Sequence, residues 1–174
     1  MRRRPLRVVV EDPKVYSYVV AELRKRGVPL SDTSGIEVRW NKEDPEVFVG
    51  KAVTISSGKE SFEELVIGID TNSRDNIALV AVGDGEILEY ERVQMESLCR
   101  EVKRITRMYP HKREVIGVGS GNPIGVEAFI ELSNCSNTVK LVDERSTSRR
   151  NVFLQGKFPE DVVAAYNIAM RALT

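Results

Sequence analysis

The apolar positions of this chain fall into short runs separated by polar turn residues, and one run has the form of a central strand. Residues 65–69 are apolar without interruption and stop at Asp70, which is followed by the turn-forming residues Thr71-Asn72-Ser73. Such a run predicts a buried strand that delivers a carboxylate to the end of a sheet. Open α/β sheets place their chemistry at strand ends of this kind.

The residues after this strand predict two more strands and then alternating helices and strands. Apolar runs at 77–82 and 86–90 are joined by Gly83-Asp84-Gly85, which is typical of a hairpin. Residues 95–109 have the i, i+4, i+7 apolar spacing of an amphipathic helix. The remaining elements are predicted as a strand at 114–118, a short helix at 124–132, a strand at 139–142 and a last helix at 162–173. We therefore expect an α/β fold.

A smaller unit is predicted before this domain. Residues 6–10 form an apolar strand pattern, and Asp12-Pro13 then supplies an N-cap and a first-turn proline for a helix at 13–26. Further strands are expected at 36–40 and, from a loose alternation, at 47–50 and 52–55. The sequence thus predicts a small N-terminal α/β unit over residues 1–62 and a larger domain over residues 63–174.

The composition is that of a soluble globular protein. Hydrophobic residues make up 41% of the chain, charged residues 30%, and the formal net charge is zero. No apolar stretch is long enough for a membrane span, and the basic start runs into Pro5 instead of an apolar leader. We therefore expect a cytoplasmic protein. The abundance of Glu, Lys and Arg beside only two glutamines is typical of thermophile proteins.

The cysteines and the histidine do not suggest a metal site. The chain has two cysteines, Cys99 and Cys135, and one histidine, His111, with no spacing typical of zinc ligands. We interpret both cysteines as ordinary thiols.

Carboxylates occur at three predicted element ends. Asp70 ends the first core strand, Asp143 and Glu144 follow the strand at 139–142, and Asp161 opens the last helix. If that helix crosses the sheet near these strand ends, the acids converge, and converging carboxylates repel one another unless cations are bound. Oxygen-only ligands suit Mg2+ or Mn2+, and a pair of such ions can promote phosphodiester hydrolysis. The expected metal ligands are Asp70, Asp143, Glu144 and Asp161.

The same segments resemble the RuvC/YqgF group of RNase H-like proteins, whose YqgF branch is described as Holliday junction resolvase-like nucleases. The matching segments are VIGID at 66–70, VIGVGSGNP at 115–123, VDERSTS at 142–148 and PEDVVAAYNIAMRAL at 159–173. The resemblance implies an RNase H-like mixed five-stranded sheet, formed by a three-strand antiparallel meander and then alternating helices and strands. It also implies that Asp70, Glu144 and Asp161 are catalytic.

Nucleic acid is the partner that this resemblance implies. Phosphates would be held by the basic residues that follow the acid pair, Arg145, Arg149, Arg150 and Lys157. The glycine-rich loop at 119–123 could bring Ser120 and Asn122 to a phosphate as well. Enzymes that cleave branched junctions act on two symmetric strands, so a homodimer would suit this function.

Two other functions compete with a metal-dependent nuclease. The turn after Asp70 lacks the glycines usual in the family, so a non-catalytic RNase H-like module that binds nucleic acid or a protein partner is an open alternative. An actin-like phosphotransferase shares the acid-ended first strand. That class normally needs two such domains, and 174 residues are too few for both.

Overall fold

The computed structural model describes residues 2–144 and 154–174, which form two compact units. The first consists of the residues up to Phe62 together with Ile105–Lys112, and the second of Glu63–Arg104 together with Arg113–Thr174. Residues 105–112, which we expected in the larger domain, therefore group with the N-terminal unit. None of the helices in the described part of the chain is long and apolar enough to span a membrane.

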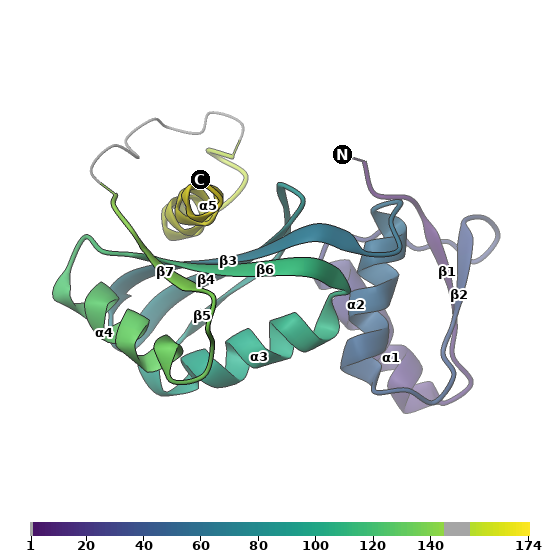
Figure 1. The fold of residues 1–174 in the computed structure, drawn as a ribbon. Helices are drawn as coiled ribbons and strands as arrows, with labels where there is room; N and C mark the ends of the chain where they lie inside the picture. Colours follow the sequence, from purple (N-terminus) through teal and green to yellow (C-terminus); the bar gives the residue numbers. More distant parts are fainter. Residues whose placement is uncertain (1, 145–153) are drawn as a thin grey trace. The chain divides into compact units, whose positions relative to one another are not determined.

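The first unit is a small parallel α/β arrangement (Figure 1). Strands β1 (Leu6–Val9) and β2 (Ile36–Arg39) pair in parallel. Helix α1 (Pro13–Lys25) connects them, and its N-cap is Asp12, whose side chain accepts hydrogen bonds from the backbone of Lys14 and Val15, as predicted. Gly27, at a φ of 73°, follows the helix in the left-handed conformation that glycine adopts easily.

Helix α2 (Pro45–Ser56) corrects the prediction of strands at 47–50 and 52–55. Its start repeats the chemistry of α1, because Asp44 Oδ1 accepts a 2.9 Å hydrogen bond from the backbone N–H of Glu46 and Pro45 occupies the first turn. The helix then buries apolar residues on more than one side, so its sequence shows little amphipathic spacing. Packing has overridden the strand propensity of its β-branched residues.

Contacts of Gly50 and Arg107 explain why residues 105–112 belong to the first unit. A Cβ atom at Gly50 would overlap the main-chain carbonyl of Met108, so only glycine permits this approach of α2. The guanidinium of Arg107 pairs with Asp44 at 2.7 Å and with Glu46 at 3.3 Å. These contacts connect two segments that are far apart in sequence.

The second unit is built on a mixed five-stranded sheet in the order β5-β4-β3-β6-β7. Strands β3 (Phe62–Ser73), β4 (Asn76–Gly83) and β5 (Glu86–Val93) form the predicted antiparallel meander. Strands β6 (His111–Gly119) and β7 (Val139–Val142) pair in parallel. The turn between β4 and β5 has positive φ angles at Asp84 and Gly85, as a tight two-residue hairpin requires. The predicted α/β class is confirmed.

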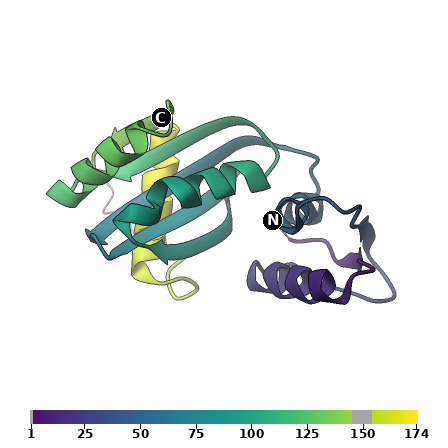
Figure 2. The same ribbon diagram turned by 90° about the horizontal axis from the view of Figure 1, so that it is seen from below.

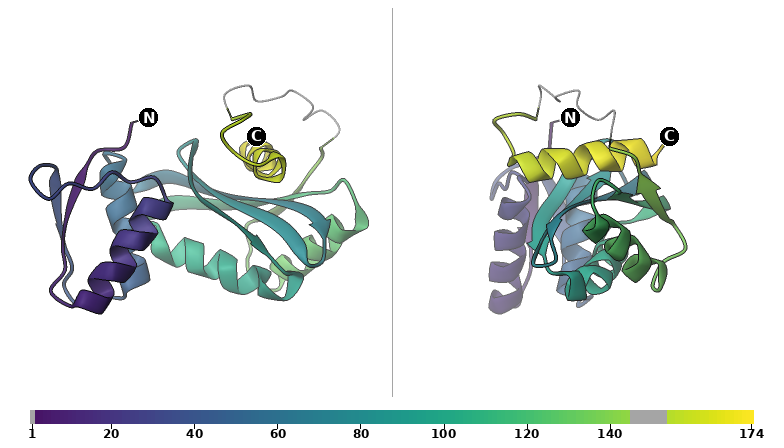
Figure 3. Two further views of the ribbon diagram at one scale, coloured as in Figure 1. Left: turned by 180° about the vertical axis from the view of Figure 1, so that it is seen from behind. Right: turned by 90° about the vertical axis from the view of Figure 1, so that its left-hand side faces the viewer.

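Helices cover both faces of this sheet (Figures 1 and 2). Helix α4 (Pro123–Ser133) and the first part of α3 (Leu98–Met108), which follows a short 3-10 turn at Met95–Ser97, lie on one face. Helix α5 (Glu160–Ala172) lies on the other and crosses the strands, as the two views in Figure 3 show. This crossing determines where Asp161 lies.

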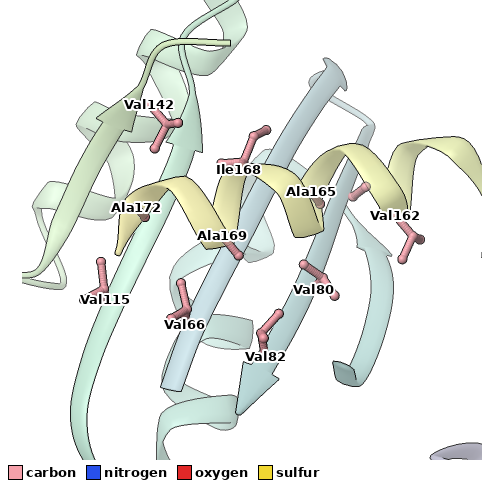
Figure 4. Packing of buried hydrophobic residues seen from close by; sticks show 11 residues of the cluster. Val66, Val80, Val82, Val115, Val142, Val162, Ala165, Ile168, Ala169 and Ala172 are labelled. Atoms are coloured by element: carbon pink, nitrogen blue, oxygen red, sulfur yellow. The ribbon is translucent and has the colours of Figure 1, made fainter. Parts of the chain in front are cut away.

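The contact between α5 and the sheet is tight because small residues face one another. Valines of the strands point toward alanines and Ile168 of the helix (Figure 4). A Cβ atom at Gly68 of β3 would overlap the carbonyl oxygen of Ala165, and one at Gly117 of β6 would come within 2.7 Å of the Ala172 methyl. Both glycines therefore let the helix backbone lie directly on the strands. Such close packing fixes the helix, and hence its first turn, relative to Asp70.

Cys99 and Cys135 form a disulfide, which corrects the prediction of two ordinary thiols. Their Cα atoms are 6.2 Å apart, within the usual range for a disulfide. Cys99 lies in the first turn of α3 and Cys135 just beyond α4. Their sequence separation of 36 residues gives no sign of this proximity, which arises because both helices cover the same face of the sheet.

Candidate carboxylate site

Asp70 lies near the end of β3 on the sheet face that α5 covers. It is paired with Ala78 of β4, and Ala78 is paired in turn with Arg92 of β5. Residues that lie directly opposite on neighbouring strands point to the same face of a sheet. Ala78 belongs to the apolar cluster beneath α5. Asp70 and Arg92 therefore face the helix in one row, two strand spacings or about 10 Å apart.

Arg92 holds Asp161, the acid in the first turn of α5. Its Nε donates to Asp161 Oδ2 at 2.9 Å and its Nη2 donates to Oδ1 at 2.8 Å, which is a bidentate ion pair. The Asp161 side chain is 16% exposed and that of Arg92 45%. The N-cap of the helix, Pro159, provides no capping side chain. The negative charge of Asp161 is thus compensated by Arg92 together with the helix N-terminus.

Glu144 reaches the same region from the chain beyond β7. Its two carboxylate oxygens lie where Cβ atoms would stand at Gly119 and Gly121. The glycine loop after β6 therefore makes the space that the Glu144 carboxylate occupies. Asp143 differs from its neighbour, because its residue is exposed and its main-chain carbonyl accepts a 2.7 Å hydrogen bond from Arg171.

Hydrogen bonds hold the glycine loop in place. The Asn122 side chain donates from Nδ2 to the Thr71 carbonyl at 2.7 Å, and its Oδ1 accepts from the Thr71 hydroxyl at 3.2 Å. The same Oδ1 caps α4 by accepting from the Gly125 N–H at 3.0 Å. Ser120 donates from both its backbone N–H and its hydroxyl to the Val142 carbonyl. The loop is thereby connected to the ends of both β3 and β7.

The charges of Glu144 and Asp161 both act on the Asp70 carboxyl. Partial burial raises the pKa of Asp70 to about 6, and the negative charges of Glu144 and Asp161 add to this effect. Each of these causes penalises the ionised form of Asp70. A cation placed among the three acids would relieve the repulsion between them.

The described residues offer the right kind of ligand for a divalent cation, but the ligands are not gathered closely enough to bind one. Carboxylate oxygens are the ligands that Mg2+ and Mn2+ prefer. Over residues 2–144 and 154–174, however, no three acidic, histidine or cysteine side chains lie close enough together to hold a metal ion. Asp161 is turned onto Arg92 instead. The Asp161 carboxylate would have to leave this ion pair before it could bind a cation together with Asp70 and Glu144.

The remaining predicted contacts fall into three groups. Arg145, Arg149 and Arg150 lie outside the described residues. Lys157 is exposed in a turn before α5. Ser120 and Asn122 use their side chains within the protein, although Ser120 itself is exposed.

Arg92 and Thr71 are site residues that sequence reasoning missed. Thr71 is buried, and its hydroxyl contacts the loop residue Asn122. Its position directly after Asp70 was a usable signal. Arg92 gave no comparable signal, because its alignment with Asp70 depends on a register shift between β4 and β5 at Ala81/Val82.

Comparison with known proteins adds no further assignment: no protein-family model matches the chain, and no curated protein matches it.

Proposed function

We propose that the second unit is an RNase H-like nuclease that depends on Mg2+ or Mn2+ and cleaves structured, branched DNA or RNA. The observation that carries this proposal is the position of Asp70, whose pKa is raised toward 6 by burial and by the charges of Glu144 and Asp161. Glu144 and Asp161 come from two other chain segments, and the charge of each acts on Asp70. The central place of β3 in the sheet supports the RNase H-like assignment.

The residues have distinct roles in this proposal. Asp70, Glu144 and Asp161 would hold the cation, with Asp161 leaving Arg92 to do so. Asp143, which is exposed beside Glu144, stays a predicted further ligand. The cation supplies positive charge that stabilises the negative charge developing on the phosphate during hydrolysis. Gly119 and Gly121 leave room for Glu144, and Asn122 positions their loop. Arg92, once released, offers a guanidinium fork suited to a backbone phosphate.

The proposal is tested by cleavage of a four-way junction and of simpler duplex and single-stranded substrates with Mg2+ or Mn2+. Asp70→Asn keeps the shape of the side chain and removes its charge, so cleavage should fall by about two or more orders of magnitude while binding is retained. Asp75→Asn is the matched control, because Asp75 is exposed in the β3–β4 turn and should leave cleavage unchanged. Equal cleavage by both variants would contradict the assignment.

One observation favours a second candidate, a non-catalytic RNase H-like module that binds nucleic acid or a protein partner. Arg92 already neutralises Asp161 through two short hydrogen bonds, and the described side chains form no ready three-ligand cluster. An ion pair of this kind can serve to fix α5 on the sheet. In the non-catalytic module the acids would stabilise the fold and would not bind a metal.

Thermal melting with and without Mn2+ distinguishes the two candidates. A cation that binds only the folded state raises the melting temperature by mass action, so the wild type should melt higher with Mn2+ and Asp70→Asn should respond much less. Equal responses of the two proteins, together with no cleavage of any substrate, would favour the non-catalytic module.

A further inference from the structure

The first unit contains a pocket at the carboxyl ends of its two parallel strands. The cavity measures about 650 Å³, and its wall includes residues just beyond β1 and β2, among them Trp40, Asn41 and Lys42. The backbone N–H of Trp40 donates to the carbonyl of Val9 at 3.0 Å, which closes the floor between the strands. Parallel α/β sheets bind ligands outside the carboxyl ends of their strands. We call this cavity the β1–β2 pocket.

An aromatic residue, Trp40, lines the pocket. Trp40 is the only tryptophan of the chain and is half-buried. Its indole N–H donates to the carbonyl of Glu43 at 2.8 Å, so the orientation of the ring is fixed. An aromatic side chain that is held in place and lines a cavity offers a face on which a planar ring can stack.

Two cationic residues, Lys42 and Arg39, also line the pocket. Lys42 is exposed and forms no ion pair with any residue in the described part of the chain. Its backbone has a φ of 60°, the left-handed conformation that lysine adopts rarely and glycine easily. Arg39 is 60% exposed, and among the described residues its side chain makes one ion pair, a long contact of 3.5 Å with Glu37. Both side chains have hydrogen-bond donors left for an anion.

Carboxylates complete the pocket. Asp12 accepts hydrogen bonds from the first turn of α1, and the neighbouring Glu11 is exposed. Both residues line the cavity, and carboxylate oxygens are hydrogen-bond acceptors. The wall therefore combines an aromatic face, hydrogen-bond acceptors and cations. A nucleotide has the matching groups, namely a planar base, the amino and hydroxyl donors of base and ribose, and a phosphate.

We propose that the β1–β2 pocket binds a nucleotide, with the base against Trp40 and the phosphate near Lys42 and Arg39. Its volume lies within the range of small-ligand sites in proteins. The nucleotide is either free or part of a single strand, and both present the same chemistry. This pocket lies wholly within residues 9–42 and shares no residue with the carboxylate site, so it stands whether or not the second unit is a nuclease.

Tryptophan fluorescence tests the proposal directly, because Trp40 is the only source of the signal. The full chain is titrated with adenosine 5′-monophosphate, with adenosine and with a short single-stranded deoxyadenosine oligomer, all with a chelator that removes divalent cations. We expect saturable quenching by the monophosphate or the oligomer, and weaker binding of adenosine because it lacks the phosphate. Saturation by the monophosphate identifies a free nucleotide as ligand, and saturation by the oligomer alone identifies a strand.

Lys42→Gly is the decisive variant. It removes the charge, and glycine suits the positive φ, so melting temperature should be equal to or above that of the wild type. Affinity should fall about tenfold, as expected for the loss of one charged hydrogen bond. Lys25→Ala is the control, because it lies at the other end of α1, about 20 Å away along the helix, and should bind as the wild type does.

Two results would overturn the proposal. One is the absence of saturable quenching by both the monophosphate and the oligomer. The other is equal affinity in wild type and Lys42→Gly. Cleavage is not measured in this experiment, so its failure would leave the proposed nuclease untouched, and a failed cleavage assay would leave the pocket untouched.

Discussion

The guanidinium of Arg92 donates hydrogen bonds to both carboxylate oxygens of Asp161, and this ion pair connects the edge strand β5 to the first turn of α5. Arg92 belongs to the same row of the sheet as Asp70. It competes directly with any cation for the same carboxylate oxygens. The state of Asp161 is therefore the point on which the two candidate functions differ.

Arg92→Gln should strengthen metal binding if Asp161 is a metal ligand. The variant removes the competing charge while keeping a side chain of similar length. Without metal it should be less stable than the wild type by about 1 kcal/mol, since the pair is partly exposed. The Mn2+ concentration that half-saturates the rise in melting temperature should fall about fivefold or more.

Arg74→Gln provides the comparison for this variant. Arg74 pairs with Glu127 and Glu96 in exposed positions, away from the row of Asp70. It should leave the Mn2+ response unchanged. An Arg92→Gln protein with the wild-type Mn2+ response would mean that Asp161 does not take part in metal binding.

Asp70→Asn should stabilise the metal-free protein in a pH-dependent way. The folded-state pKa of Asp70, about 6, lies above its value in the unfolded chain, so ionising Asp70 costs stability as pH rises from about 4 to 7. The asparagine variant lacks this cost. We expect it to exceed the wild type by about 1–3 kcal/mol above about pH 7 and to match it near pH 4, apart from a small constant offset.

Chemical denaturation of both proteins across this pH range, with a chelator present, measures the difference. Asp75→Asn again serves as control, because its exposed side chain should show no such trend. A constant difference between Asp70→Asn and the wild type at all pH values would show that Asp70 has an ordinary pKa.

Gly121→Ala should displace the Glu144 carboxylate without unfolding the protein. A Cβ at this exposed position would overlap a Glu144 carboxylate oxygen, and that side chain can swing away at low cost. We expect a stability change below about 1 kcal/mol. The pKa of Asp70 should fall, because a neighbouring negative charge has moved off.

A titration of the Asp70 carboxyl by NMR checks this effect. Glu144→Ala should lower the pKa of Asp70 by a similar amount, and the double variant should add nothing further. Additive shifts would mean that Gly121 does not act through Glu144.

Much of the fold could be predicted from local sequence patterns, and the errors of the prediction also have local causes. The meander was predictable because apolar runs, the Asp84-Gly85 turn and the carboxylate of Asp70 all indicated the same structure. Helix α2 was predicted wrongly because its β-branched residues suggest strands. Its Asp44-Pro45 start is nevertheless the same N-cap and proline signal that predicts α1.

The acidic residues of the site could be predicted from the sequence, but Arg92 could not. If β4 and β5 paired residue by residue from their turn, without a bulge, Glu91 would lie opposite Ala78. The register shift at Ala81/Val82 places Arg92 there instead and turns Glu89 and Glu91 toward α3. A one-residue shift moves the side chains of a strand to the opposite face of the sheet. No pattern in this sequence predicts the shift.

Arg104 on α3 neutralises the carboxylates that this shift places on the other face. It contacts Glu89 at 2.7 Å, Glu91 at 3.1 Å and Glu101 at 2.8 Å. Burial and a hydrogen bond to Glu101 raise the pKa of Glu91 to about 7 even with Arg104 present. Arg104→Met would leave three partly buried acids without this cation, so we expect a loss of about 2–4 kcal/mol at neutral pH.

The loss should shrink in acid, because protonation removes the repulsion among the three carboxylates. Thermal melts at about pH 5 and about pH 8 measure this dependence. Arg100→Met is the control, since Arg100 is 76% exposed and its contact with Glu101 is 3.6 Å. A deficit in Arg104→Met that did not change with pH would indicate lost packing and not lost charge.

The disulfide between Cys99 and Cys135 should contribute substantially to the stability of the second unit. It closes a loop of 36 residues, and a cross-link of that length stabilises a protein by about 3–4 kcal/mol when the native geometry accommodates it. Reduction with dithiothreitol should therefore lower the melting temperature of the wild type. The Cys99→Ser/Cys135→Ser double variant should melt near the reduced wild type and should not respond to the reductant. Alkylation followed by mass spectrometry reports the state of the thiols directly, and modification of both cysteines in the unfolded protein before any reduction would show that the bond does not form.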